Sequence, residues 1–319
     1  MDYREFACAV KEQMNYQMTG GVRAQLHTAV KNNGTERTGV LIEAPGINIS
    51  PTIYLEEYYE DYRKGASMEK IVGDIIAFYG SVRQERSWDC RKILTYDGVR
   101  EQVVFKLINT AQNRAFLRTV PHIDFLDLSI VFYVLLEITD EGTASMAVTL
   151  EHAEQWGVRA EQLWEDAGEN VKRLLPAEFF TMNYALKEIL KKGIGIKDGR
   201  SAAEENLLGN DSDVRDGMYV LSNKMRNYGA ACIVYPHILE MIWNILQTDY
   251  YVLPSSVHEV IITPCHKSIT CGELDEMIQD INATQVDAEE VLSGHAYLYE
   301  QRTGSLCIGT DRSAGRGTA

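Results

Sequence analysis

The amino-acid sequence predicts an α+β fold made of two subdomains, each a small, mostly antiparallel sheet packed with helices. Three observations lead to this prediction. Residues 218–264 form the densest apolar stretch and follow a strand–strand–helix–strand–strand pattern. Residues 22–31 alternate apolar and polar side chains, and an Asn-Asn-Gly turn joins them to a partner strand at residues 38–43, which is typical of an antiparallel hairpin. Residues 193–217 contain five glycines and almost no apolar periodicity, which indicates a linker or mobile loop between the subdomains.

The N-terminal subdomain is expected to span residues 1–192. Asp2 can cap its first helix, and Gly20-Gly21 ends that helix. Its helices are predicted from apolar side chains spaced by three or four residues, and they cover residues 2–18, 53–64, 68–79, 97–118, 159–173 and 176–192. Its strands are predicted from alternating or β-branched runs, and they cover residues 22–31, 38–43, 128–138 and 144–150.

The C-terminal subdomain is expected to span residues 218–308 in the order ββ-α-ββ-α-ββ. Its first hairpin is predicted from two β-branched and aromatic runs, residues 219–221 and 230–235, which a polar loop separates. Pro236 then suits the first turn of a helix, because its missing N–H is not needed there. The elements predicted after this helix are strands at 250–253 and 257–262, a helix at 272–282, and a hairpin of 295–299 with 305–308. Residues 309–319 are rich in Gly, Ser, Thr and Arg and are expected to be a disordered tail.

The composition is that of a globular protein kept in the cytoplasm. The chain has 319 residues, 45% of them hydrophobic and 24% charged, which is enough to build a large core. Its longest apolar stretch, residues 128–136, is too short to span a bilayer, which takes about 20 residues. The first residues carry acids and lack the basic-then-apolar order of a signal peptide. We therefore expect a cytoplasmic protein without a membrane partner, whose six scattered cysteines are reduced thiols.

The net charge of −15 is concentrated in two segments. Residues 137–170 hold nine acids and one base, and residues 273–290 hold seven acids and no base. Contacts with phosphate need clustered Lys and Arg, so no direct nucleic-acid binding is expected. Two interpretations of the acidic segments stay open. They are solvated helix faces that aid solubility, or they form an acidic surface that docks on a basic partner or mimics nucleic acid.

The most suggestive polar group is Ser255, Ser256, His258 and Glu259. A serine near a histidine and a carboxylate suggests a nucleophile. However, in an extended strand the Cα atoms of Ser256 and His258 would lie about 6.5–7 Å apart, and Glu259 would point to the opposite face. A turn in which the serine hydroxyls bond their own backbone is the structural alternative. We assign no catalytic residue and keep these four residues as candidates for contact with a ligand.

A zinc site would draw on Cys265, His266 and Cys271 together with His258 or His295. The donor types suit zinc, but a Cys-x5-Cys spacing is not typical of zinc ligands and a second pair is missing. The sequence therefore predicts neither a metal site nor a cofactor.

Three tyrosines lie at helical spacing in the predicted helix over residues 53–64. Tyr54, Tyr58 and Tyr62 follow one another at four-residue intervals, and acidic residues fill the gaps. Such a row packs a helix on a sheet or forms a partner-binding face, because tyrosine is enriched at protein interfaces.

Five segments of the sequence together suggest a known family: MYVLSN, YGAACIVYP, YYVLPSSVHEVIITP, PTIYLEEYYEDYRKG and HIDFLDLSIVFYVLLE. In these segments the chain resembles an uncharacterised family of bacterial proteins of unknown function from Gram-positive anaerobes. The resemblance covers most of the chain. It implies no established activity and no site residues.

Three functional hypotheses follow. The first is a non-enzymatic binding or regulatory protein that acts through a protein–protein surface on an unidentified protein partner. It is favoured by the two acidic segments, the tyrosine row and the lack of any nucleotide-binding, metalloprotease, nucleophile-elbow or kinase motif. The second is an enzyme of unrecognised class, which requires Ser256 and His258 to converge on one pocket with a third polar group. The third is an acidic inhibitor that mimics nucleic acid, which requires the two acidic segments to merge into one surface.

Overall fold

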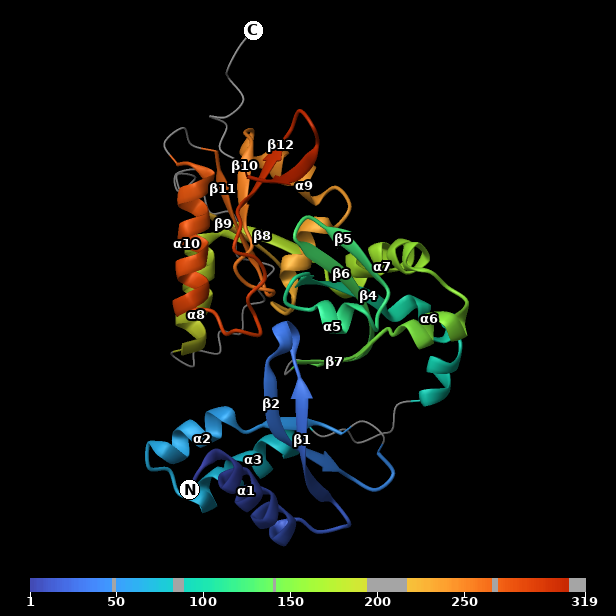
Figure 1. Cartoon of the computed structure of the whole chain (residues 1–319), viewed down its shortest axis with the longest axis vertical. Helices are drawn as coiled ribbons and strands as arrows, with labels where there is room; N and C mark the ends of the chain where they lie inside the picture. Colours follow the sequence, from blue (N-terminus) through green and yellow to red (C-terminus); the bar gives the residue numbers. More distant parts are fainter. Residues whose placement is uncertain (48–49, 83–88, 140–141, 194–216, 266–268, 310–319) are drawn as a thin grey trace. The chain divides into compact units, whose positions relative to one another are not determined.

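The computed structural model describes residues 1–319 except 48–49, 83–88, 140–141, 194–216, 266–268 and 310–319. The fold is α+β, as the sequence predicts, and it contains three mostly antiparallel sheets. The chain forms two compact units (Figure 1): unit 1 holds Met1–Leu94 and Leu136–Ala144, and unit 2 holds Thr95–Leu135 and Ser145–Ala319.

These units do not coincide with the predicted subdomains 1–192 and 218–308, since the chain enters unit 2 at Thr95. The predicted linker lies outside the described residues from 194 to 216, and the predicted tail lies outside them from 310 onward. Strands β8 (Ala177–Thr181) and β9 (Tyr219–Asn223), on either side of the linker segment, are hydrogen-bonded neighbours in unit 2.

Unit 1 consists of a three-stranded antiparallel sheet and the helices that share its core. Its elements are α1 (Tyr3–Gln17), β1 (Arg23–Val30), the 3-10 helix η1 (Asn32–Gly34), β2 (Glu36–Glu43), β3 (Thr52–Tyr54), α2 (Glu56–Arg63), α3 (Met68–Val82) and the 3-10 helix η2 (Cys90–Leu94). The sheet order is β1-β2-β3. The Asp2 carboxylate accepts a hydrogen bond of 2.8 Å from the Glu5 N–H, which confirms the predicted cap of α1. Phe6 and Met14 of this helix are fully buried against the sheet.

The predicted helix over residues 53–64 begins later than the periodicity indicates. Thr52–Tyr54 pair with β2 instead, and α2 starts at Glu56. This pairing needs a glycine at residue 39, because a Cβ there would lie only 2.6 Å from the carbonyl oxygen of Ile53. The spacing of the tyrosines is helical from Tyr54 to Tyr62. It therefore cannot show that strand β2 pairs with Thr52–Tyr54.

Unit 2 contains a six-stranded sheet, a smaller sheet and the helices between and around them. Its elements before the linker segment are α4 (Tyr96–Val99), η3 (Arg100–Gln102), β4 (Val103–Asn109), α5 (Arg114–Leu117), β5 (His122–Phe125), β6 (Leu128–Thr139), β7 (Gly142–Ala147), α6 (Leu150–Trp156), α7 (Ala160–Leu174), β8 and α8 (Met182–Gly193). The end of β6 from Leu136 and the start of β7 up to Ala144 belong to unit 1. Its elements after that segment are β9, η5 (Gly229–Val234), α9 (Ile238–Leu246), β10 (Tyr250–Leu253), β11 (Val260–Pro264), α10 (Cys271–Thr284), β12 (Tyr297–Glu300) and β13 (Ser305–Ile308). The sheet orders are β13-β12-β10-β11-β9-β8 and β4-β6-β5, with β7 paired to β6.

The two faces of the six-stranded sheet pack against different elements. Side chains such as Leu253, Ile261 and Val220 point to the face that α8 and α10 cover (Figure 1). Alternate side chains, such as Tyr250, point to the opposite face, which η5 and α9 cover; the Tyr250 hydroxyl donates to the Leu239 carbonyl of α9 at 2.9 Å. A sheet covered on both faces has uniformly apolar strands, as the fully buried β10 shows.

The predicted helix over residues 97–118 is wrong. Val103–Asn109 form β4, which pairs with β6 along its whole length. Helix α7 packs on one side of β4, where the rings of Phe105 and Trp164 lie 4.9 Å apart. The residues of this strand are almost all buried, and a run of buried apolar residues has no period that separates a strand from a helix.

Two further predicted elements differ because each contacts strand β9, which lies elsewhere in the sequence. Residues 230–235 are predicted as a strand, but Gly229–Val234 form the 3-10 helix η5. At Gly229 a Cβ would lie 2.1 Å from the Ser222 hydroxyl oxygen, so the chain turns here in close contact with β9. Residues 176–192 are predicted as one helix, but β8 takes the first part because it pairs with β9, and α8 follows.

The remaining predicted elements are confirmed with shifts of a few residues at their ends. Within the described residues, none of the helices combines the length and the apolar character that crossing a membrane requires.

Candidate functional site

Ser256 and His258 lie together, but in a turn instead of a strand. Strand β11 begins at Val260, later than predicted, so Ser256 and His258 precede it. Ser256 is buried and forms an isolated bridge with Val291. Its hydroxyl oxygen accepts a hydrogen bond of 3.0 Å from the backbone N–H of His258. The serine therefore stabilises the turn, as the structural alternative predicts, and its hydroxyl bonds the backbone of the histidine instead of the imidazole.

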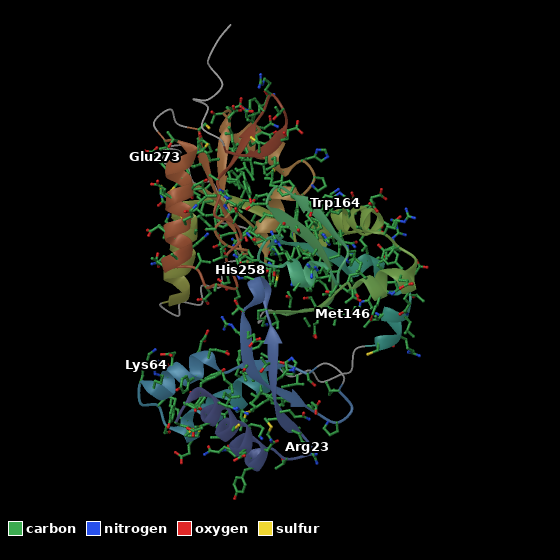
Figure 2. The ribbon with its side chains drawn as sticks, in the orientation of Figure 1. Arg23, Lys64, Met146, Trp164, His258 and Glu273 are labelled. Carbon is green, nitrogen blue, oxygen red and sulfur yellow. The ribbon has the colours of Figure 1, made fainter. Side chains whose placement is uncertain are left out.

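The His258 imidazole is held on both sides. Its Nδ1 accepts from the Tyr228 N–H at 3.3 Å, so the ring proton lies on Nε2, which donates to the Glu290 carboxylate at 3.2 Å. The His258 carbonyl also accepts from the Ser222 hydroxyl at 2.8 Å. Both ring nitrogens therefore have hydrogen-bond partners, and the bond to the Tyr228 N–H fixes the loop that ends at Gly229. Figure 2 labels His258 at its place in unit 2.

The loop from Ser222 to Gly229 is built to hold Tyr228. The Asn223 side chain donates to the Asn227 carbonyl at 2.8 Å and accepts from two backbone N–H groups of the loop. Arg226 and Tyr228 both adopt left-handed backbone conformations with φ of 52°. Such conformations cost about 1–3 kcal/mol each and persist only where the surroundings impose them.

Tyr228 and Tyr133 enclose a lysine. The Nζ atom of Lys106 lies 3.8 Å from the ring centroid of Tyr228 and 4.0 Å from that of Tyr133, in the range of cation–π contacts. Burial, and to a smaller extent Tyr228, raises the pKa of the Tyr133 hydroxyl well above its ordinary value. Burial likewise raises the pKa of Glu259, whereas nearby His258 and Arg226 act to lower it. The sequence does not reveal this cluster, because its members are distant along the chain.

The tyrosine candidates lie in unit 1 and mainly pack there. Tyr58 and Tyr62 pack against the core of unit 1, and the Tyr62 ring lies 5.3 Å from that of Phe6. Tyr54 belongs to β3 instead of α2, and the Lys31 Nζ lies 4.1 Å from its ring centroid. The three tyrosines therefore do not form one row on a helix.

The residues considered for zinc do not gather into a ligand set in the part of the chain that the structure describes. His295 is bound to the Asp275 carboxylate at 3.1 Å, and His258 is bound as described above. Cys271 is buried at the start of α10. His266 lies outside the described residues.

The two acidic segments do not form one surface on their helices. Helix α10, which carries Glu273, and helix α7, which carries Trp164, lie on opposite sides of unit 2 (Figure 2). A mimic of nucleic acid requires these segments to merge, so this arrangement counts against the third hypothesis.

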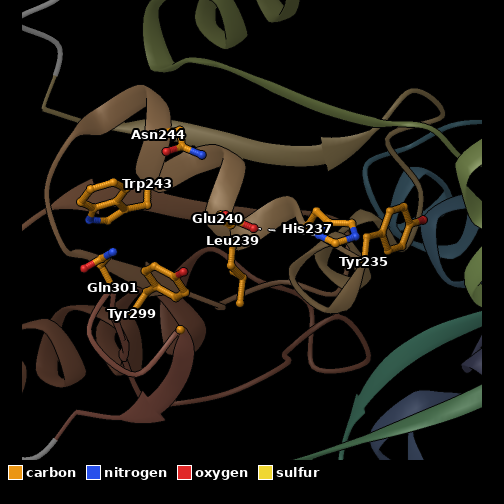
Figure 3. A pocket seen from close by; sticks show the side chains of 9 residues that line it. Tyr235, His237, Leu239, Glu240, Trp243, Asn244, Tyr299 and Gln301 are labelled. Atoms are coloured by element: carbon orange, nitrogen blue, oxygen red, sulfur yellow. Dashed lines mark ion pairs between the residues drawn. The ribbon is translucent and has the colours of Figure 1, made fainter.

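A different site lies beside α9, where nine residues line a pocket of about 420 Å³ (Figure 3). Six of them come from α9 and the residues leading into it: Tyr235, His237, Leu239, Glu240, Trp243 and Asn244. The other three, Tyr299, Gln301 and Gly304, come from the β12–β13 hairpin. Figure 3 shows Trp243, Gln301 and Tyr299 side by side and Glu240 directed towards His237, which lies 3.9 Å away.

The pocket is held in shape by its surroundings. The Tyr299 ring stacks on the buried Tyr250 at a centroid distance of 4.9 Å. Gln301 is held by its backbone N–H, which donates to the Asp249 carboxylate at 3.0 Å. Burial raises the pKa of the Tyr299 hydroxyl, and the charges of Glu240 and Asp249 raise it further. The pocket therefore has aromatic side chains in its lining and the Glu240 carboxylate among them.

Sequence reasoning missed this site, although one signal could have found it. Helix α9 has seven apolar residues among nine, with Glu240 and Asn244 as its polar residues, yet only Ile242 of this helix is buried. A short helix with so few polar residues exposes apolar side chains wherever no other element covers it, and such exposure marks a binding surface.

The fold and this pocket define an α+β protein with an exposed apolar helix beside an aromatic, acidic pocket. The chain belongs to a family of unknown function, DUF5688, whose model matches residues 3–301. This confirms the resemblance to an uncharacterised family. Comparison with curated proteins and with solved structures finds no match.

Proposed function

We propose that this protein is a non-enzymatic binding protein that acts through a protein–protein surface centred on α9. The observation that carries the proposal is the exposure of two apolar side chains on the helix that also lines the aromatic pocket. Met241 and Ile245 lie one turn apart and are 40% and 43% exposed, although the helix around them is apolar. Exposed apolar helix faces are typical of surfaces that bind another protein.

The state of the other candidate site supports binding over catalysis. The enzyme hypothesis needs the Ser256 hydroxyl to meet the His258 imidazole, but the hydroxyl bonds the backbone N–H and both imidazole nitrogens have other partners. This leaves the region without an activated nucleophile, because a nucleophilic serine needs a base within hydrogen-bonding reach.

The partner is a protein segment that combines apolar and basic side chains. Apolar side chains would cover Met241 and Ile245, while basic ones would face Glu240 and Asp249 at the pocket. The chain as a whole carries a net charge of −15, which favours the approach of a basic partner.

Selection from a displayed library of random peptides tests the proposal. The immobilised full-length chain should enrich peptides that bind the double variant Met241→Lys, Ile245→Lys at least about tenfold more weakly. The matched control is Met277→Lys, Ile281→Lys on α10, a Met/Ile pair with the same spacing and with exposures of 47% and 41%. Circular dichroism checks that both variants fold.

Two outcomes contradict the proposal. One is that no peptide family is enriched over an empty surface. The other is that enriched peptides bind the α9 variant as tightly as the α10 variant.

A further inference from the structure

We propose that the pocket beside α9 binds the guanidinium group of an arginine side chain in the partner's docking segment. This inference rests on the proposed function and specifies its partner. Three properties of the pocket carry it: its aromatic walls, its charge and its polar acceptors.

The aromatic walls suit a flat cation. Trp243 and Tyr299 come from different elements and face the same space (Figure 3). Tyr299 is held in place by its stack on Tyr250, whose hydroxyl is itself bound to the Leu239 carbonyl. A guanidinium plane stacks on aromatic faces, and tryptophan provides the strongest cation–π contact of the aromatic side chains.

The charge of the pocket selects a cation. Glu240 is among the nine described lining residues, and neither a lysine nor an arginine is. The Glu240 carboxylate lies 3.9 Å from the His237 imidazole, and both side chains are largely exposed. Asp249 adds a second carboxylate close enough to act on the Tyr299 hydroxyl.

The polar acceptors favour arginine over lysine. A guanidinium has five N–H donors in one plane, whereas a lysine ammonium is a compact charge with three. The carboxylate of Glu240 and the amide oxygen of Asn244 on α9, with the amide oxygen of Gln301 on the β12–β13 hairpin, provide acceptors around the pocket. A planar donor group can reach several of them while it stacks on an aromatic ring.

The size of the pocket also fits one side chain. Its volume of about 420 Å³ lies near the lower end of the range for small-molecule sites, about 300–1,000 Å³. This space holds an arginine side chain together with some water, but not a helix or strand of the partner.

Titration of the full-length chain with three capped amino acids tests the inference. The probes are N-acetyl-arginine amide, N-acetyl-lysine amide and N-acetyl-citrulline amide, the last of which has the shape of arginine without its charge. The readout is the indole N–H signal of Trp243, assigned with the variant Trp243→Phe. We expect arginine to bind with a Kd on the order of millimolar, as a ligand of this size does. Lysine should bind about fivefold more weakly and citrulline about tenfold more weakly.

Glu240→Gln should weaken arginine binding by about fivefold, because an exposed carboxylate makes a modest contribution. The matched control is Glu276→Gln on α10, which removes the same charge away from the pocket and should leave the Kd unchanged. A Trp243 signal that does not respond to arginine overturns the inference. So does citrulline binding as tight as that of arginine, or a Kd that Glu240→Gln does not change.

The peptide library separates this inference from the proposed function. Enriched peptides that need Met241 and Ile245 but contain no arginine overturn the inference and support the proposed function. Conversely, arginine binding at Trp243 without any enriched peptide supports the inference about the pocket chemistry and overturns the proposed function.

Discussion

Individual residues in unit 2 are held in unfavourable conformations by a dense set of contacts. Tyr228 adopts a left-handed backbone while its N–H bonds His258 and its ring contacts the Lys106 ammonium. The next residue, Gly229, has backbone and side-chain atoms close to the position that a Cβ would take. The Cβ of any other residue would lie 2.6 Å from the backbone nitrogen of Asn223 and 2.6 Å from the carbonyl oxygen of His258.

Gly229→Ala is therefore expected to destabilise the protein by about 1–3 kcal/mol, the cost of overpacking a close contact. Backbone atoms cannot move aside as the end of a flexible side chain can. The measurement is the free energy of unfolding in urea. Gly73→Ala is the matched control: this glycine lies within α3, where a Cβ would contact nothing within 4 Å, so the change should stabilise by about 0.5–1 kcal/mol. Equal effects of the two changes would show that the contact at Gly229 is not tight.

At the scale of elements, one carboxylate ties α7 to the segment that leads into β4. Asp166 of α7 accepts hydrogen bonds from the Tyr96 hydroxyl at 2.7 Å, the Arg100 Nε at 2.9 Å and the Gln162 amide at 3.0 Å. Burial acts to raise the pKa of Asp166, but these three hydrogen bonds and the charge of Arg100 outweigh it. The net effect holds the pKa below its ordinary value.

The lowered pKa of Asp166 predicts a pH-dependent contribution to stability. A carboxyl group with a lowered pKa in the folded state stabilises that state above its unfolded pKa of about 3.9 and loses this contribution as pH falls through the folded pKa. Asp166→Asn should therefore destabilise the protein at pH 7, and its difference from wild type should shrink below about pH 4. Urea unfolding across this pH range measures the difference.

Tyr96→Phe serves as the control for this prediction, because it removes one of the three donors and keeps the carboxylate. It should make the loss of stability in acid smaller without abolishing it. A difference between wild type and Asp166→Asn that stays constant from pH 7 to pH 3 would contradict the assignment.

At the scale of the whole molecule, the two sheets of unit 2 are joined by partly buried polar contacts. Asp127, next to the start of β6, accepts from the Tyr297 hydroxyl of β12 at 2.5 Å and from the Ser293 hydroxyl at 2.7 Å. Asn109, at the end of β4, donates to the Leu292 carbonyl at 2.9 Å. Burial, with a further effect of Asp127, raises the pKa of Tyr297, so its hydroxyl stays a donor at neutral pH.

Tyr297→Phe is expected to destabilise unit 2 by about 1–3 kcal/mol, because it removes one of the two hydroxyl donors to the partly buried Asp127 carboxylate and leaves Ser293 as the other. Amide hydrogen exchange should show faster exchange in β6 and in β12 together, since the contact joins the two sheets. Tyr16→Phe, at a tyrosine that is 92% exposed, should change neither stability nor exchange. Faster exchange confined to β12 would mean that the contact does not couple the sheets.

Elements whose signals are local were predictable from the sequence. Helix α1 has its cap at Asp2 and its apolar side chains at helical spacing, and α10 is similarly capped by Thr270. The β1–β2 hairpin follows from its alternation and its Asn-Asn-Gly turn. In each case the residues that specify the element lie within a few positions of one another.

Elements that depend on distant partners were not predictable in this way. Strands β3 and β8 contain residues that fit a helix, and each becomes a strand because it pairs with β2 or β9. Strand β4 is nearly uniform in burial, which removes the period that would have identified it. Among the candidate sites, His258 was found from its sequence neighbours, whereas Lys106 and Tyr228 are brought to it only by folding.

By itself, the sequence determined the fold class, the family, most helices and the position of the acidic segments, since composition and short-range periodicity encode these properties. The tertiary structure decided which apolar runs became strands, that the Ser256 hydroxyl bonds the backbone of His258, and that α7 and α10 lie apart. It also decided that Trp243 and Tyr299 share one pocket. The physical reason is that pairing and burial depend on residues tens or hundreds of positions away, whose distances only the folded chain sets.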